Sequence, residues 1–138
     1  MKKIALSILL LFTGSSYLTA QLPDYKVIFD MSTRDSISQQ ALIRELTIIT
    51  TENPTAMLEV VIYGQAIRMI TKAESKHPEA ISGLITNKHV SFKVCSFTMK
   101  RNNLAAADLL PSVEIVPDGI YEIISKQHAG WGYIKVAH

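Results

Sequence analysis

The stretch Met57-Leu58-Glu59-Val60-Val61-Ile62-Tyr63-Gly64 decides the fold class of this chain. Residues 57–63 are rich in β-branched and other apolar side chains, and they predict a strand. Gly64 stands at the strand-to-helix turn, where the absence of a side chain lets the backbone bend sharply. Residues 66–71 then predict a short helical segment.

The preceding residues predict another strand and helix. Residues 25–31 form a strand whose continuously apolar centre indicates cover on both faces. Ser36 is predicted as the N-cap of a helix that runs to about Thr50, with Gln39 completing a capping box. Apolar residues of this helix fall on one stripe, as in a helix packed on a sheet.

The alternation continues towards the C-terminus. We predict helices over 78–87 and 120–129, strands over 90–95, 113–116 and 131–136, and a segment over 98–110 that is polar first and helical later. Alternating strands and helices favour an α/β fold, with a parallel or mostly parallel sheet between helices. The pattern does not reveal the order of the strands.

The N-terminus has the layout of a secretory signal peptide. Met1-Lys2-Lys3 is positive, residues 4–12 are apolar except for Ser7, and a small, polar stretch follows to Ala20. Cleavage is expected after Ala20, or alternatively after Ser16, so 1–20 is predicted as the signal and the product as periplasmic or secreted. The apolar run is shorter than the about 20 residues of a spanning helix, so no stable membrane insertion is expected after processing. The alternative is a buried N-terminal helix.

Composition excludes several classes of protein. Of the 138 residues, 48% are apolar and 19% charged, which is ordinary for a globular protein. One cysteine excludes an intrachain disulfide framework and a thiolate zinc cluster. Loss of Lys2 and Lys3 with the signal reduces the number of basic residues from 14 to 12, which equals the number of acidic residues. The net charge of the processed chain is then zero, so no nucleic-acid partner is expected. Residues 21–138 are predicted as a single domain.

Cys95 is the main candidate for chemistry. It ends the strand predicted over 90–95, and ligands of open α/β sheets gather outside the carboxyl ends of the strands. The nearby cations Lys100 and Arg101 would favour a thiolate, which is the nucleophilic form of cysteine. The alternative is a packed cysteine that acts as a small hydrophobic residue.

Other candidates are weaker. Gly64 and Gln65 follow another strand and are placed in the same cleft as Cys95, with a plain turn glycine as the alternative. The chain lacks a Gly-x-Ser-x-Gly nucleophile elbow and a phosphate-binding glycine loop. The scattered histidines have no paired metal-ligand spacing, and no metal site is expected; they are His77, His89, His128 and His138.

Several segments together resemble the DsrE/DsrF-like family. They occur in the family's order and cover roughly residues 25–136. The quoted segments are Val60-Val61-Ile62-Tyr63-Gly64-Gln65-Ala66-Ile67, Val90-Ser91-Phe92-Lys93-Val94-Cys95-Ser96-Phe97-Thr98-Met99-Lys100-Arg101-Asn102, Leu109-Leu110-Pro111, Val116-Pro117-Asp118-Gly119 and Gln127-His128-Ala129-Gly130-Trp131-Gly132-Tyr133.

The resemblance implies a three-layer α/β/α sandwich with a mainly parallel five-stranded sheet. It also implies a sulfur carrier in which Cys95 holds a persulfide and needs no metal or organic cofactor. A homo-oligomer, either a trimer or a hexamer, and a thiol-bearing protein as sulfur donor or acceptor follow from the same resemblance. The alternative function is a non-catalytic oligomeric binding or scaffold protein with a small-ligand cleft at the strand ends.

Overall fold

A computed structural model describes residues 25–86 and 90–137. The predicted signal sequence, residues 1–20, lies outside the described residues, as do His89 and His138. The elements follow one another in the order β1 (Lys26–Met31), α1 (Ser36–Glu52), β2 (Met57–Ile62), the 3₁₀ helix η1 (Gly64–Ile70), α2 (Pro78–Thr86), β3 (Val90–Cys95), α3 (Ser96–Arg101), the 3₁₀ helix η2 (Ala106–Asp108), β4 (Glu114–Val116), α4 (Gly119–His128) and β5 (Gly132–Val136).

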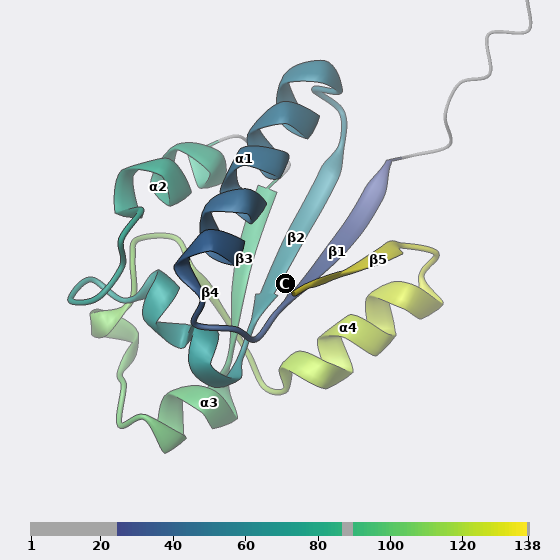
Figure 1. Cartoon of the computed structure of the whole chain (residues 1–138). Helices are drawn as coiled ribbons and strands as arrows, with labels where there is room; N and C mark the ends of the chain where they lie inside the picture. Colours follow the sequence, from purple (N-terminus) through teal and green to yellow (C-terminus); the bar gives the residue numbers. More distant parts are fainter. Residues whose placement is uncertain (1–24, 87–89, 138) are drawn as a thin grey trace, which may run out of the picture.

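The five described strands form one sheet in the order β4-β3-β2-β1-β5, and every pair is parallel. Figure 1 shows α1 and α2 over one face of this sheet and α4 over the other. The prediction of a three-layer α/β/α sandwich with a five-stranded sheet is therefore confirmed. Because all strands are parallel, their carboxyl ends meet at one edge, and β1, β2 and β3 are central or near-central there.

Two hydrophobic clusters of different size lie on the two faces of the sheet. The larger one packs α1 and α2 on side chains such as Phe29, Val60 and Phe92. The smaller one has only Ile28 and Val61 from the sheet and Ile123 from α4 among its buried members. Adjacent strand residues belong to opposite clusters because side chains alternate along a strand.

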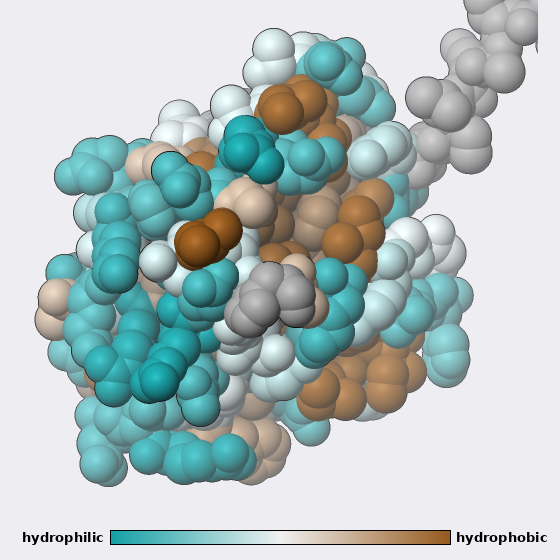
Figure 2. All heavy atoms as spheres, viewed as in Figure 1, coloured by the Kyte–Doolittle hydropathy of each residue, from teal (hydrophilic) through white to brown (hydrophobic). Residues whose placement is uncertain are grey.

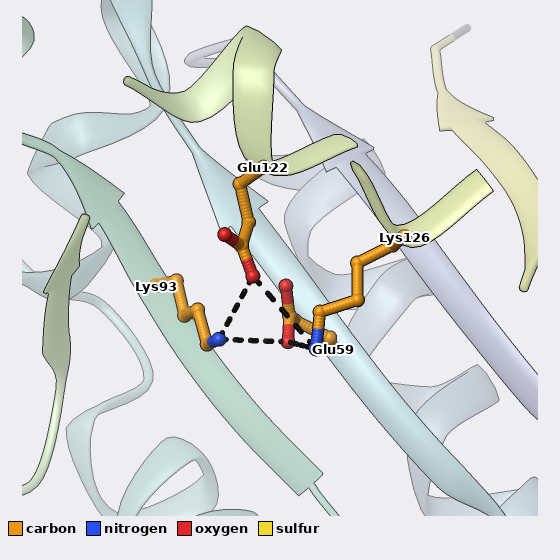
Figure 3. Close-up of polar contacts among 4 residues, drawn as sticks. All are labelled: Glu59, Lys93, Glu122 and Lys126. Carbon is orange, nitrogen blue, oxygen red and sulfur yellow. Dashed lines mark hydrogen bonds and ion pairs between the residues drawn. The ribbon is translucent and has the colours of Figure 1, made fainter. Parts of the chain in front are cut away.

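Four charged side chains lie beside the smaller hydrophobic cluster, between α4 and the sheet. Glu59 of β2 and Lys93 of β3 point towards Glu122 and Lys126 of α4, as Figure 3 shows. The Lys93 Nζ lies 3.1 Å from Glu59 Oε2 and 2.9 Å from Glu122 Oε1, and the Lys126 Nζ lies 3.0 Å from Glu59 Oε2. Burial raises the pKa of Glu59 even though both lysines oppose the rise. α4 is therefore held by charge pairs as well as by apolar contact.

The helix starts at Gly64 and Gly119 lie one or two residues before the predicted ones, and two other helix starts also differ from the predictions. The N-cap of α1 is Asp35 rather than Ser36, because the Asp35 carboxylate accepts a 2.7 Å hydrogen bond from the Ser38 N–H. The segment 98–110 is helical first: α3 begins directly after Cys95, and only the short η2 follows. We find no helix in the described ranges that is both long and apolar enough to cross a membrane.

Candidate functional site

Cys95 lies at the carboxyl end of β3 and is 7% exposed. Its neighbour in the sheet is Val116 of β4, and α3 begins at the next residue. The cysteine lines a cavity of about 280 Å³, so it is buried against protein on most sides and open to a hollow on one. The cavity is lined by Tyr63, Gly64, Cys95, Phe97, Thr98, Arg101, Asp118 and Ile120.

Hydrogen-bond donors converge on the sulfur of Cys95. Burial is the largest single influence and acts to raise the pKa of the thiol. The backbone N–H groups of Gly119, Thr98 and Phe97 and the hydroxyl of Thr98 together outweigh it, so the pKa of Cys95 lies below that of an ordinary cysteine. These N–H groups belong to the first turns of α3 and α4, where backbone donors lack partners within the helix.

Thr98 links the sulfur to the turn after β2. The Gly64 N–H donates a 3.2 Å hydrogen bond to the Thr98 Oγ1, which leaves the threonine hydrogen to be donated to Cys95. Gly64 has a φ of +59°, a conformation that favours glycine and that turns its N–H towards α3. Thr98 is only 6% exposed, so packing holds its hydroxyl in place.

A close approach of α4 brings the Gly119 N–H to the sulfur. A Cβ added at Gly119 would lie 3.1 Å from Val61 Cγ1 and 3.2 Å from Cys95 Cβ, which is tighter than ordinary packing. Asp118 caps the helix, since its Oδ1 accepts a 2.8 Å hydrogen bond from the Ile120 N–H. The sequence Asp118-Gly119 therefore fixes where α4 begins relative to Cys95.

The site residues proposed from sequence divide into two groups. Gly64 and Arg101 line the cavity of Cys95, and they also line a neighbouring cavity of about 380 Å³. Gln65 lines only the neighbouring cavity. Lys100 lines neither of these two cavities, and its Nζ lies 5.8 Å from the ring centroid of Phe97.

The cause of the low thiol pKa differs from the one expected. From the sequence, the charges of Lys100 and Arg101 are expected to favour the thiolate. The dominant favourable influences are hydrogen bonds from backbone N–H groups and from Thr98. Backbone donors carry no signature in a sequence, because every residue except proline has one.

Tyr63, which lines the cavity of Cys95, also lies next to a polar cluster around Asp30. Asp30, at 4% exposure, accepts hydrogen bonds at Oδ2 from the Tyr133 hydroxyl (2.6 Å) and from the Lys135 Nζ (3.1 Å). The Lys135 Nζ also lies 3.5 Å from the Tyr63 hydroxyl oxygen. Burial and the neighbouring Asp30 raise the pKa of Tyr63, so it presents a neutral hydroxyl beside the cavity.

Several residues of this site were missed from sequence. Thr98 follows Cys95 by three residues, a spacing that places both on one side of a helical turn, and this signal was available. The Asp118-Gly119 pair is part of a family motif, but nothing in the sequence indicates its contact with Cys95. Across the described ranges, no group of three or more histidine, cysteine, aspartate or glutamate residues is arranged to hold a metal ion.

Comparison with known families and structures identifies the chain. The model of the DsrE/DsrF-like family matches residues 26–136. The chain belongs to the DsrE/DsrF-like family. The resemblance inferred from the sequence is thereby confirmed over nearly the whole described region, and membership places the chain in a sulfur-relay-type family.

Solved structures of similar fold agree with this membership. MTH1491 of Methanobacterium thermoautotrophicum, a protein of unknown function, is 28% identical, with a TM-score of 0.75 over 81% of this chain and 99% of its own. BT1422 of Bacteroides thetaiotaomicron, a conserved protein of unknown function, is 9% identical (TM-score 0.68; 81% and 95% covered). The ychN protein of E. coli is 13% identical (TM-score 0.67; 80% and 97% covered). No curated protein matches the chain.

Proposed function

We propose that this DsrE/DsrF-like protein is an exported sulfur carrier that holds a persulfide on Cys95. The observation that supports this most is the convergence of three backbone N–H groups and the Thr98 hydroxyl on a thiol that lines a cavity. Such donors stabilise a thiolate, which is the form that attacks sulfur. They also suit a persulfide anion at the same place, because it carries the same charge one atom further out.

The transfer we propose is a displacement at sulfur. The Cys95 thiolate attacks the outer sulfur of a donor persulfide, a new S–S bond forms, and the S–S bond of the donor breaks. The electron pair of the broken bond leaves on the donor as a thiolate, and the proton stays with the transferred sulfur. A partner thiolate then attacks that outer sulfur, so that Cys95 is regenerated without an external oxidant or reductant.

We propose that the protein acts as a homo-oligomer, either a trimer or a hexamer. Figure 2 shows apolar residues gathered over α4. Ile120, Tyr121 and Ile124 of this helix are 48%, 71% and 46% exposed. A cluster of large exposed apolar side chains marks a surface that contacts protein. Because Ile120 also lines the cavity of Cys95, contact at this surface would place a subunit or a thiol-bearing partner protein beside the sulfur.

The same apolar surface supports the second candidate function, a non-catalytic oligomeric scaffold. In that function Cys95 is a packed residue, and the cavity at the strand ends binds a small ligand. The low exposure of Cys95, 7%, favours the scaffold. The hydrogen-bond donors around its sulfur favour the carrier. The two functions differ in whether the folded protein gains sulfur.

Mass spectrometry after incubation with polysulfide distinguishes the sulfur carrier from the non-catalytic scaffold. The native protein is expected to gain about 32 Da for each sulfur bound, and the gain is expected to disappear on reduction. Cys95→Ser should abolish the gain while keeping the far-ultraviolet circular dichroism spectrum. Absence of any gain on the folded native protein, with a gain only after denaturation, would contradict the carrier and leave the scaffold.

A further inference from the structure

The larger cavity next to that of Cys95 is lined by three arginines. Arg34 follows β1, Arg68 lies in η1 after β2, and Arg101 ends α3 after β3, so three successive strands each bring one arginine to the same edge of the sheet. Gly64, Thr98 and Arg101 line both cavities. The arginine-lined cavity therefore adjoins the hollow into which Cys95 opens.

Among the described residues, only one of the three arginines of this cavity has an ion-pair partner. Arg68 pairs with Glu74, which lies outside the lining of this cavity. In the ranges 25–86 and 90–137, neither Arg34 nor Arg101 forms an ion pair, and no acidic residue lines the cavity. Guanidinium groups form paired hydrogen bonds with carboxylates and oxyanions, and like charges gathered in a hollow favour an anionic occupant.

We infer that this cavity binds the anionic part of a small sulfane-sulfur donor and directs the donor's sulfur towards Cys95. The inference rests on the proposed carrier function and specifies its donor: a small molecule that bears a carboxylate or an oxyanion, rather than a protein. The volume of about 380 Å³ exceeds what one oxyanion fills. A further cavity shares Arg34 and Arg68 with it and is also lined by Gln39, Glu74 and Lys76; the one carboxylate among these, on Glu74, pairs with Arg68. The two cavities together leave room for a donor whose carboxylate lies several bonds from its sulfur.

The reaction balances for either source of the anion. With thiosulfate, the Cys95 thiolate attacks the outer sulfur, the S–S bond of thiosulfate breaks, and its electron pair leaves with sulfite. With a carboxylate-bearing persulfide, the same attack releases the carboxylate-bearing thiolate. In both reactions one sulfur is transferred and the charge is conserved, so no further reactant is needed.

The first test compares three donors by the rate of mass gain on Cys95. They are thiosulfate, the persulfide of N-acetylcysteine, and the persulfide of N-acetylcysteine methyl ester, in which the carboxylate is replaced by a neutral ester. We expect at least one anionic donor to react about tenfold faster than the ester at low donor concentration. Arg34→Gln should reduce this ratio by about tenfold, whereas Arg44→Gln, on the exposed side of α1, should leave the ratio unchanged.

The two anionic donors show whether the cavity binds an oxyanion or a carboxylate. A preference for thiosulfate assigns the cavity to oxyanions, and a preference for the N-acetylcysteine persulfide assigns it to carboxylates. Equal rates for all three donors in the native protein, or an unchanged ratio in Arg34→Gln, would overturn the inference. In that case transfer from the ester to Cys95 would still support the carrier function.

The second test measures binding without sulfur transfer. Cys95→Ser is titrated by calorimetry with thiosulfate and, separately, with N-acetylcysteine, and both titrations are repeated with Arg34→Gln added. Binding that Arg34→Gln weakens about tenfold would support the anion site even if Cys95 gained no sulfur in the first test. Absence of binding of both compounds by Cys95→Ser, with its circular dichroism spectrum unchanged, would overturn the anion site without bearing on the carrier function.

Discussion

At the scale of single residues, Cys95 combines burial with a lowered pKa. Burial alone would suppress the thiolate, and a cysteine on an apolar strand end would then be inert. Four donors reverse that effect, and one of them, the Thr98 hydroxyl, is a side chain that can be removed without changing the backbone. The pKa of the thiol therefore depends on residues that carry no catalytic signature in the sequence.

Thr98→Val should raise the pKa of Cys95. Valine keeps the shape of threonine but removes the hydrogen bond that favours the thiolate, so the proton is released at higher pH. Thr98→Ser keeps a hydroxyl and serves as the matched control. The alkylation rate of the folded protein, measured against pH, should show its midpoint at higher pH in Thr98→Val than in the native protein and in Thr98→Ser. Coincident midpoints in all three would show that Thr98 does not stabilise the thiolate.

At the scale of elements, the position of α4 on the sheet is determined by a glycine and by charged side chains. Gly119 lets the helix start against Cys95, and the four charged side chains of Figure 3 fix the helix over the sheet. Both features affect the site, because the Gly119 N–H is one of the donors to the sulfur. Changes in the position of α4 should therefore alter stability and thiol reactivity together.

Gly119→Ala should destabilise the fold by about 1–3 kcal/mol, because the added methyl group crowds Val61 Cγ1 and Cys95 Cβ, and either these side chains or the start of α4 must shift by a few tenths of an ångström. The same variant should raise the pKa of Cys95 as the Gly119 N–H moves away. Gly83→Ala in α2 is the control: nothing lies within 4 Å of its added Cβ, and a helix interior favours alanine by about 0.5–1 kcal/mol. Urea unfolding and alkylation measure the two effects, and equal stability of both variants would contradict the close approach.

Lys93→Met should cost about 3 kcal/mol at neutral pH, because Glu59 stays buried with one fewer partner. The penalty should shrink in acid. Burial raises the folded-state pKa of Glu59, so at a pH below its unfolded value the carboxyl is neutral in both states and needs Lys93 less. Lys76→Met, on an exposed lysine, is the control for urea unfolding between pH 4 and 7. A penalty that does not depend on pH would argue against the charge pairing.

The sequence predicted the elements better than it predicted the site. The strand over 90–95 was placed correctly at both ends because Val90 to Cys95 alternates between the two faces. The start of α3 was missed, since its N-cap is Cys95, and cysteine is not a usual capping residue. The arginine-lined cavity was also missed apart from Arg101 and the Gly64-Gln65 turn, because Arg34 and Arg68 meet only through the parallel order of β1, β2 and β3.

At the scale of the whole molecule, the exposed side of α4 predicts self-association of the DsrE/DsrF-like chain. We expect light scattering of the mature protein at micromolar concentration to report a trimer or hexamer. Tyr121→Glu should dissociate it, because a charge would be buried in an apolar contact. Ile37→Glu, which changes a residue that is 74% exposed on α1, should leave the assembly intact. A monomer at all concentrations would contradict the prediction.

Export is a second prediction at this scale. N-terminal sequencing of the protein from its native host should begin near Gln21 or Tyr17, after removal of the signal predicted over residues 1–20. An intact Met1 on a cytosolic species would contradict export. In that event the sulfur partners of the carrier would be cytosolic.

The rate of iodoacetamide labelling of Cys95 in the folded protein, measured as a function of pH, tests the central claim most directly. If the converging donors hold a reachable thiolate, labelling should be fast at neutral pH, with a midpoint below that of an ordinary cysteine. Labelling that occurs only after denaturation would contradict the claim and show that Cys95 is a packed residue.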